Sequence, residues 1–362
     1  MMKKLGILIF GLMLLTGKLH AGIEGFDIFG VDDKTQQKII STCSEMIVEY
    51  SDVSKKVHFT EKPPSEKDVN HMKALEKKII AKVKQLGDFE VVKISVVYYP
   101  TEQTQFATLD LVRIGDIERM PKKQMVVAKK KSVKSKELAQ LFTVWNTYDD
   151  NNNRLLIRNQ YDSTKKKCPV MHCTWGFDAV ERKEILPKLQ KGVAKHKKEL
   201  MDIVKNTSLN EAEREQSVFI LANDTNYQEM ASFLINFTDD PSEGVRNNTM
   251  RVLAAIAAKH KIKDLDISRI FKALNYPYVT DRNKASYVLL GVVQNDPSTH
   301  ATVIMQSGQS LLELLKLKQP NNHDFAYSIL RVLSNKNYGE RDYKHWEQWI
   351  KQQQDILSKA KG

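Results

Sequence analysis

The feature that most constrains the fold is a segment that nearly repeats itself 36 residues later. In the first copy Pro241 precedes an Arg-Asn pair by five residues, and in the second copy Pro277 does the same. A run of apolar residues with helical spacing follows each copy. A repeat of this length is typical of stacked helical hairpins, because a single hairpin buries its apolar face only against its neighbours.

The second half of the chain is predicted to be all-α. From about residue 178 onward strand patterns disappear, and nine helical segments follow one another, which a mixed α/β composition would not produce. We predict a domain over 178–362 that consists of hairpins. The predicted segments are 178–205, 209–222, 226–237, 243–260, 264–275, 281–294, 298–317, 322–335 and 341–358.

This half resembles the HEAT-like repeat family over roughly residues 205–335. The matching positions are Asp240, Pro241, Val245, Arg246, Pro277, Asp281 and Arg282. The resemblance implies an α-solenoid in which the turn Pro starts a helix and the Asp and Arg residues form a ladder between successive repeats. We therefore expect these charges to be structural. A third copy departs from the pattern, because it has Asn322-His323-Asp324 and no Arg.

Residues 22–177 are predicted to form an α+β domain built on a small antiparallel sheet. Their pattern changes from helical spacing to alternation rich in Val, Ile and Tyr and then back. The predicted helices are Lys34 to Tyr50, Ser65 to Leu86 and Ser135 to Trp145. The predicted strands are Phe89 to Tyr99, Gln105 to Ile114 and Arg154 to Tyr161.

Residues 1–21 have the pattern of a secretory signal peptide. Lys3 and Lys4 precede an apolar run of 12 residues, and Leu19-His20-Ala21 offers a cleavage point after Ala21. The apolar run is shorter than the roughly 20 residues that a membrane-spanning helix needs, although an uncleaved anchor is the alternative. We predict an exported protein, periplasmic or secreted. The bacterial style of the signal argues against nucleic acid as a partner.

The three Cys are Cys43, Cys168 and Cys173. Export would place them where disulfides persist, and Cys168 and Cys173 are close enough in sequence to close a small loop. We predict a disulfide between them. Two alternatives are free thiols and a metal site that uses both Cys with His172, which lacks a fourth ligand at a typical spacing.

Lys residues are concentrated in one segment of this basic chain, whose formal charge is +12. Lys122 to Lys136 contains seven Lys and no acidic residue. Such a segment is usually a solvated loop, and its alternative role is contact with an anionic polymer or a lipid headgroup. The candidate contact residues are Lys129, Lys130, Lys131 and Lys134.

A calcium-loop pattern is present only in part. Asp149, Asn151 and Asn153 have the spacing of the first three ligands, but Arg154 stands where a Gly is needed and Gln160 where a Glu is needed. We interpret this run as a turn before a strand and expect no metal.

No catalytic motif or cofactor-binding motif is present in the sequence. The leading hypothesis is a non-enzymatic scaffold of a bacterial envelope that binds a protein partner through its helical repeats. The alternatives are a binder of anionic envelope polymers or lipid headgroups and an unrecognised enzyme in the α+β domain. A deep pocket with converging His, Asp or Cys side chains in residues 22–175 would favour the enzyme.

Overall fold

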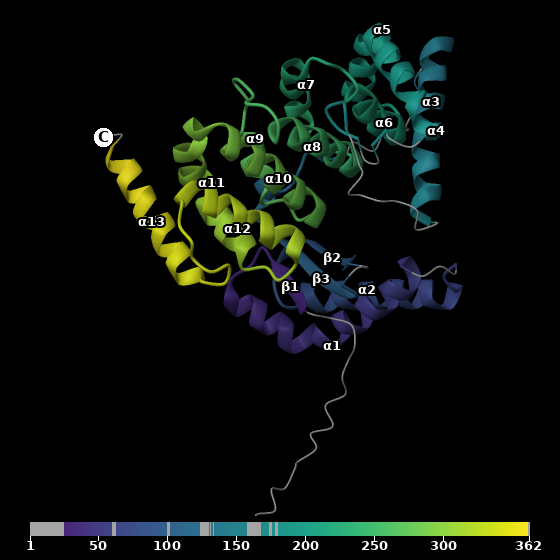
Figure 1. The fold of residues 1–362 in the computed structure, drawn as a ribbon. Helices are drawn as coiled ribbons and strands as arrows, with labels where there is room; N and C mark the ends of the chain where they lie inside the picture. The colour runs from purple at the N-terminus through teal and green to yellow at the C-terminus, as the bar shows by residue number, and fades with distance from the viewer. Residues whose placement is uncertain are drawn as a thin grey trace, which may run out of the picture.

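The protein consists of a small sheet flanked by two helices and a curved stack of helices (Figure 1). In a computed structural model, the described residues contain no helix that is long and apolar enough to cross a membrane. The ranges that the structure describes are 25–59, 63–99, 102–123, 130, 132, 134–157, 168–173, 176–177 and 180–360. The predicted signal peptide lies outside them.

The sheet has three strands in the order β1-β3-β2. The strands are β1 (Gly25–Phe29), β2 (Phe89–Tyr99) and β3 (Thr104–Arg113). Two of the three predicted strands form the antiparallel pair β2–β3, which confirms that part of the prediction. β1 was not predicted, and it pairs with β3 in parallel, so the small sheet is mixed.

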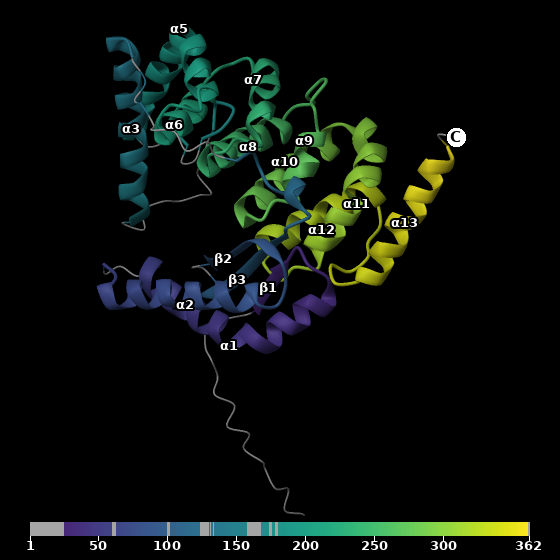
Figure 2. The same ribbon diagram turned by 180° about the vertical axis from the view of Figure 1, so that it is seen from behind.

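Alternation along β3 gives the sheet two different faces. Ala107, Leu109 and Leu111 lie in an apolar core with α1 (Asp33–His58) and α2 (Glu66–Lys84). Successive strand residues point to opposite faces, so Asp110 points the other way, toward the helical stack. The sheet is therefore covered by its own helices on one face and by the repeat on the other (Figure 2).

The helical stack begins with α3 and runs to the end of the described chain. Every one of the nine predicted helical segments contains helix. The elements are η1 (Ile117–Arg119), α3 (Lys136–Ile157), α4 (Val180–Lys183), α5 (Ile185–Lys205), α6 (Glu211–Leu221), α7 (Tyr227–Leu234), η3 (Ile235–Phe237), α8 (Glu243–Ala257), α9 (Ser268–Ala273), α10 (Val279–Asn295), η4 (Pro297–Thr299), α11 (His300–Leu315), α12 (Pro320–Ser334) and α13 (Tyr343–Lys359).

One predicted strand and the turn before it are wrong. Residues 149–157 continue α3, so Asp149, Asn151 and Asn153 lie in a helix and not in a calcium-type loop or a turn. The predicted strand Arg154 to Tyr161 begins inside this helix, and its last residues lie outside the described ranges. A short apolar run such as Leu155-Leu156-Ile157 fits the buried face of either element, and length alone separates the two.

The helices form two layers. An outer layer consists of α5, α7, α9 and α11, and an inner layer of α6, α8, α10 and α12 lies on the inside of the curve (Figure 1). α3 packs on the first hairpin and α13 on α11. The 36-residue periodicity has a structural basis, because Val252 and Val288, in the same place on α8 and α10, are both fully buried.

Two apolar cores stabilise the molecule. One lies between the sheet and α1 and α2, and the other extends through the helical stack. Leu138 of α3 and Phe177 belong to the second core, although the sequence prediction groups them with the α+β domain. Phe29 of β1 belongs to it as well, so the division between the cores does not follow the predicted boundary at residue 177.

Candidate functional site

Buried Arg residues near the start of the inner helices join successive hairpins. Nη1 of Arg214 in α6 donates to Oδ1 of Asp240 at 3.0 Å, and Nε of Arg246 in α8 donates to Oδ2 of Asp281 at 2.7 Å. Each bond links one hairpin to the next. All four side chains are at most 3% exposed, so these charges are not available to a ligand.

The third Arg of this series pairs with the sheet. Nη1 of Arg282 in α10 lies 2.6 Å from Oδ1 of Asp110 in β3, and both side chains are fully buried. The same Nη1 donates to the carbonyl of Tyr276 at 2.7 Å, in the turn that holds Pro277. Phe29 of β1 packs against the Arg282 guanidinium at 4.1 Å. Arg214 and Arg246 each pair with an Asp of the following hairpin, whereas the acid that pairs with Arg282 comes from the sheet.

A second acid of the sheet binds the start of the next inner helix. The Asp27 carboxylate of β1 accepts from the backbone N–H of Lys318 at 2.9 and 3.0 Å and from that of Gln319 at 2.9 Å, just before α12. Burial raises the pKa of Asp27, and these bonds oppose the rise. Asp27 thus attaches the start of α12 to the sheet.

The described residues between the sheet and α3 bind turns along the same edge of the stack. Nε of Arg119 donates to the carbonyl of Asn275 at 3.2 Å, and the N–H of Lys122 donates to that of Asp239 at 3.1 Å. Farther on, the N–H of Lys130 donates to the carbonyl of Ser208 at 3.0 Å. These three acceptors lie in turns of three successive hairpins. The sheet and this segment together cover the turn edge of the stack.

The candidate Lys residues have different surroundings. Lys134 forms an ion pair with Glu213 of α6, with side chains only 14% and 17% exposed, and lies 4.7 Å from the centre of the Phe142 ring. Burial raises the pKa of Glu213, but Lys134 and the Ser132 N–H lower it by more. Lys130 is exposed. Lys129 and Lys131 lie outside the described residues.

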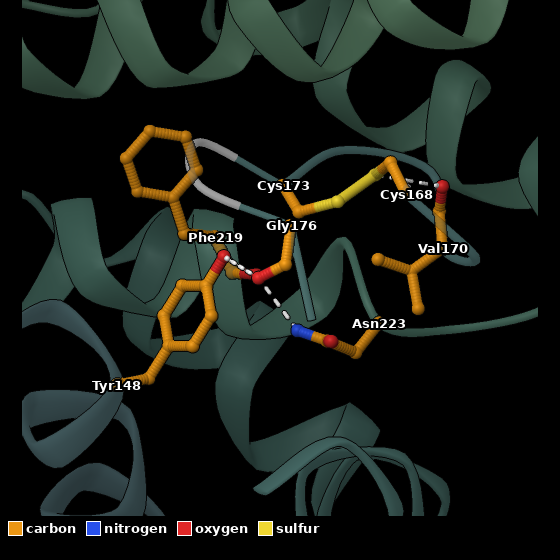
Figure 3. The surroundings of a disulfide bond; sticks show 7 residues. All are labelled: Tyr148, Cys168, Val170, Cys173, Gly176, Phe219 and Asn223. Atoms are coloured by element: carbon orange, nitrogen blue, oxygen red, sulfur yellow. Dashed lines mark hydrogen bonds between the residues drawn. A yellow bond between two sulfur atoms is a disulfide. The ribbon is translucent and has the colours of Figure 1, made fainter. Parts of the chain in front are cut away.

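Cys168 and Cys173 form a disulfide, as predicted (Figure 3). The loop is bound to the stack by the N–H of Met171, which donates to the carbonyl of Ala222 at 3.1 Å, and by the Tyr148 hydroxyl, which donates to that of Gly176 at 3.3 Å. Both thiols are used in the bond, which excludes the alternatives of free thiols and of a metal held by this pair.

Rings around the loop pack it against the stack. The His172 ring stacks on Phe219 with centroids 5.4 Å apart, and Phe177 stacks on Tyr148 at 4.8 Å. The third Cys, Cys43, is buried in the core of the sheet and is free. The disulfide loop is therefore a packed structural element of the first hairpins.

A cavity of about 570 Å³ lies where β1 and the start of α1 meet α11. Two of its ionic lining residues pair with each other: Nη2 of Arg113 is 2.7 Å from Oδ2 of Asp32, and Asp32 also caps α1 through the Thr35 N–H. The described lining contains acids and guanidinium groups but neither His nor Cys. Of its four Asp residues, Asp27 and Asp32 are already bound by backbone N–H groups of the protein.

The inner layer carries two cations of a different kind. Arg251 of α8 and Lys284 of α10 are half-buried, and neither has a carboxylate within ion-pair distance among the described residues. Instead, Nε of Arg251 donates to Oδ1 of Asn247 at 2.7 Å, and Nζ of Lys284 donates to Oδ1 of Asn283 at 2.6 Å. Burial and the nearby Arg251 charge lower the pKa of Lys284 to about 8. Burial also lowers the pKa of Arg251.

Two aromatic rings lie on the same layer. Tyr287 of α10 and Phe325 of α12 stack with centroids 5.2 Å apart, and both side chains are half-buried. Tyr287 is one helical turn from Lys284. We call Arg251, Lys284, Tyr287 and Phe325 the inner patch.

The inner patch was not predicted as a site. The available signal was the Arg-Asn pair of the repeat, whose two residues have separate roles. Arg246 and Arg282 point to the buried edge, whereas Asn247 and Asn283 hold the cations of the inner patch. Since adjacent residues of a helix point in different directions, one dipeptide serves both surfaces.

The chain has no match among known families, curated proteins or solved structures. Its class is therefore defined by its own architecture: a helical-repeat-like stack whose turn edge is covered by a three-stranded sheet from the same chain.

Proposed function

We propose that this protein is an exported, non-enzymatic scaffold that binds a protein partner on the inner layer of its helical stack. The observation that carries the proposal is the contrast between two surfaces. On the turn edge the buried Arg residues are paired within the chain, whereas on the inner layer Arg251 and Lys284 are half-buried without an acidic partner among the described residues. Large aromatic side chains and Arg are also enriched at protein interfaces.

We also propose that the repeats are of the HEAT-like kind. The bonds from Arg214 to Asp240 and from Arg246 to Asp281, each between successive hairpins, support this. Stacks of this kind commonly offer an extended concave surface to a macromolecule. Fold alone does not define a function, so the proposal depends on the chemistry of the inner patch.

Export to a bacterial envelope is part of the same proposal. The signal-like residues 1–21 support it, and so does the disulfide between Cys168 and Cys173, since disulfides persist mainly in oxidising compartments. The alternative role, contact with anionic polymers or lipid through the Lys segment, has less support because Lys134 is paired with Glu213.

Site-specific photo-crosslinking tests the scaffold. The photoreactive amino acid p-benzoylphenylalanine replaces Tyr287 on the inner layer, or Lys272 on the outer helix α9 as a matched control, in the full chain expressed in its host. We expect a discrete protein adduct from position 287 and none from position 272. Adducts of equal yield at both positions, or none at position 287, would contradict the proposal.

A further inference from the structure

The inner patch places two positive charges next to each other in an environment that disfavours them. Arg251 and Lys284 come from neighbouring helices, and the charge of Arg251 is the one that acts on Lys284. Half-burial removes part of the water that would stabilise each cation, and their mutual repulsion adds to this cost. Among the described residues, the side-chain partners of the two cations are the amide oxygens of Asn247 and Asn283.

The positions of the cations are fixed by the repeat. With the 36-residue offset, Arg251 of α8 corresponds to Tyr287 of α10. Lys284 therefore lies about one turn closer to the start of α10 than Arg251 does to the start of α8. Packed helices are about 8–10 Å apart. In an extended peptide, the side chains of residues i and i+2 lie on one face, roughly 7 Å apart. Two acidic residues at this spacing in one segment can therefore reach both cations.

The rings beside the cations favour a peptide over a simple anion. Tyr287 and Phe325 form a stacked pair that is only half-buried and can therefore bury further apolar surface against a side chain. The inner layer lies on the inside of the curved stack (Figure 1), which a flat membrane surface does not readily enter. A charged group enclosed in this way also keeps more of its attraction in salt than an exposed one.

We infer that the inner patch binds an acidic segment of a protein, with carboxylates at Arg251 and Lys284 and an apolar or aromatic side chain against Tyr287 and Phe325. This inference rests on the proposed scaffold function and specifies the chemistry of the partner. Aspartate or glutamate side chains of the partner would supply the negative charge that the described part of the chain does not place beside the two cations.

Fluorescence anisotropy with the full mature chain tests the inference. The probe is a fluorescein-labelled oligoglutamate peptide that ends in Trp, and an oligoglutamine peptide of the same length is the uncharged comparison. We expect the acidic peptide to bind, and the double variant Arg251→Gln with Lys284→Gln to bind it at least about tenfold more weakly, which corresponds to about 1.4 kcal/mol.

The matched control removes the same charge elsewhere. Lys191→Gln with Lys272→Gln changes two exposed residues of the outer layer and is expected to alter the affinity less than about twofold. Equal losses in the two double variants would overturn the inference, because the peptide would then respond to net charge alone. Absence of binding to the wild-type chain would overturn it too.

Anionic vesicles provide the second arm. If phosphatidylglycerol vesicles bind the chain through Arg251 and Lys284 while the acidic peptide does not, the patch is a lipid site and the inference is wrong. Failure of the scaffold is distinguishable from failure of this inference. A protein adduct at position 287 that persists in the Arg251→Gln and Lys284→Gln variant would retain the scaffold and reject the acidic partner.

Discussion

Arg282 of α10 and Asp110 of β3 form a fully buried ion pair that joins parts of the chain 172 residues apart. Asp110 lies on the middle strand of the sheet, and Arg282 is the last member of the Arg series that links the hairpins. The pair therefore attaches the sheet to the helical stack through the same series of Arg residues that links the hairpins.

Replacing Asp110 with Asn should destabilise the protein strongly. The change keeps the size and an acceptor oxygen but leaves the Arg282 charge uncompensated in the interior, which typically costs about 3–5 kcal/mol. Urea unfolding of the full chain measures the loss. The matched control is Asp32→Asn, which removes a charge from the exposed pair with Arg113 and keeps a good helix cap. We expect the control to unfold at nearly the wild-type urea concentration; a similar loss in both variants would contradict the role of burial.

Lys284→Met should stabilise the protein near pH 7, by about 1–2 kcal/mol after allowance for partial exposure. The pKa of Lys284 is about 8 in the folded protein, below the ordinary value of 10.5, because of burial and the Arg251 charge. The charged form of Lys284 thus works against folding.

The pH dependence provides a separate check on Lys284. Between about pH 8 and pH 10 the unfolded chain holds a proton that the folded protein has released, so the contribution of Lys284 to stability rises with pH. The advantage of the Met variant should therefore be full below about pH 8 and shrink above it. Unfolding free energies of both proteins at several pH values would show this. An advantage that stays constant over the whole range would contradict the lowered pKa.

Helical spacing made most of the C-terminal half predictable. Residues such as Val252, Leu253 and Ile256 recur on one face at intervals that only a helix places together. The hairpin β2–β3 was equally clear, because its strands alternate and are joined by a short connection. Both the helical hairpins and the β2–β3 hairpin pack against elements that are close to them in the sequence.

Contacts between distant segments account for what the sequence did not predict. β1 is five residues long and pairs with β3 about eighty residues later, so its pattern alone does not distinguish it from a loop. Asp110 looks like an ordinary polar strand residue until the stack places Arg282 beside it. The inner patch depends on which face of α8 and α10 remains uncovered, and that follows from where the sheet docks.

The disulfide between Cys168 and Cys173 should contribute modestly to stability. A loop this short gives a chain-entropy contribution of about 2 kcal/mol. The variant Cys168→Ser with Cys173→Ser should unfold at lower urea concentration by this amount, and a reducing agent should do the same to the wild type but not to the variant. Sensitivity of the variant to the reducing agent would show that the effect on the wild type does not come from this disulfide.

Lys134→Gln should reduce stability without changing vesicle binding. Glu213 would keep its bond from the Ser132 N–H but lose the cation beside it, in a site that is less than a fifth exposed. We expect a loss of about 1–2 kcal/mol in urea unfolding, between the values for exposed and buried pairs. Lys130→Gln, which removes an exposed charge of the same segment, is the control. Weaker binding of anionic vesicles by the Lys134 variant alone would favour the polyanion alternative.

Gly291→Ala should separate the two helices that carry the cations of the inner patch. A Cβ at Gly291 in α10 would lie 2.7 Å from backbone atoms of Ala257 and Ala258 at the end of α8, so one helix must move. Alanine favours a helix by about 1 kcal/mol over glycine, but overpacking typically costs about 1–3 kcal/mol, and backbone atoms cannot turn aside. We expect net destabilisation in urea and weaker binding of the acidic peptide. Gly115→Ala is the control, because no atom beyond its own residue and its two chain neighbours lies within 4 Å of the added Cβ. A Gly291 variant with full peptide affinity would show that the spacing of α8 and α10 does not matter for the patch.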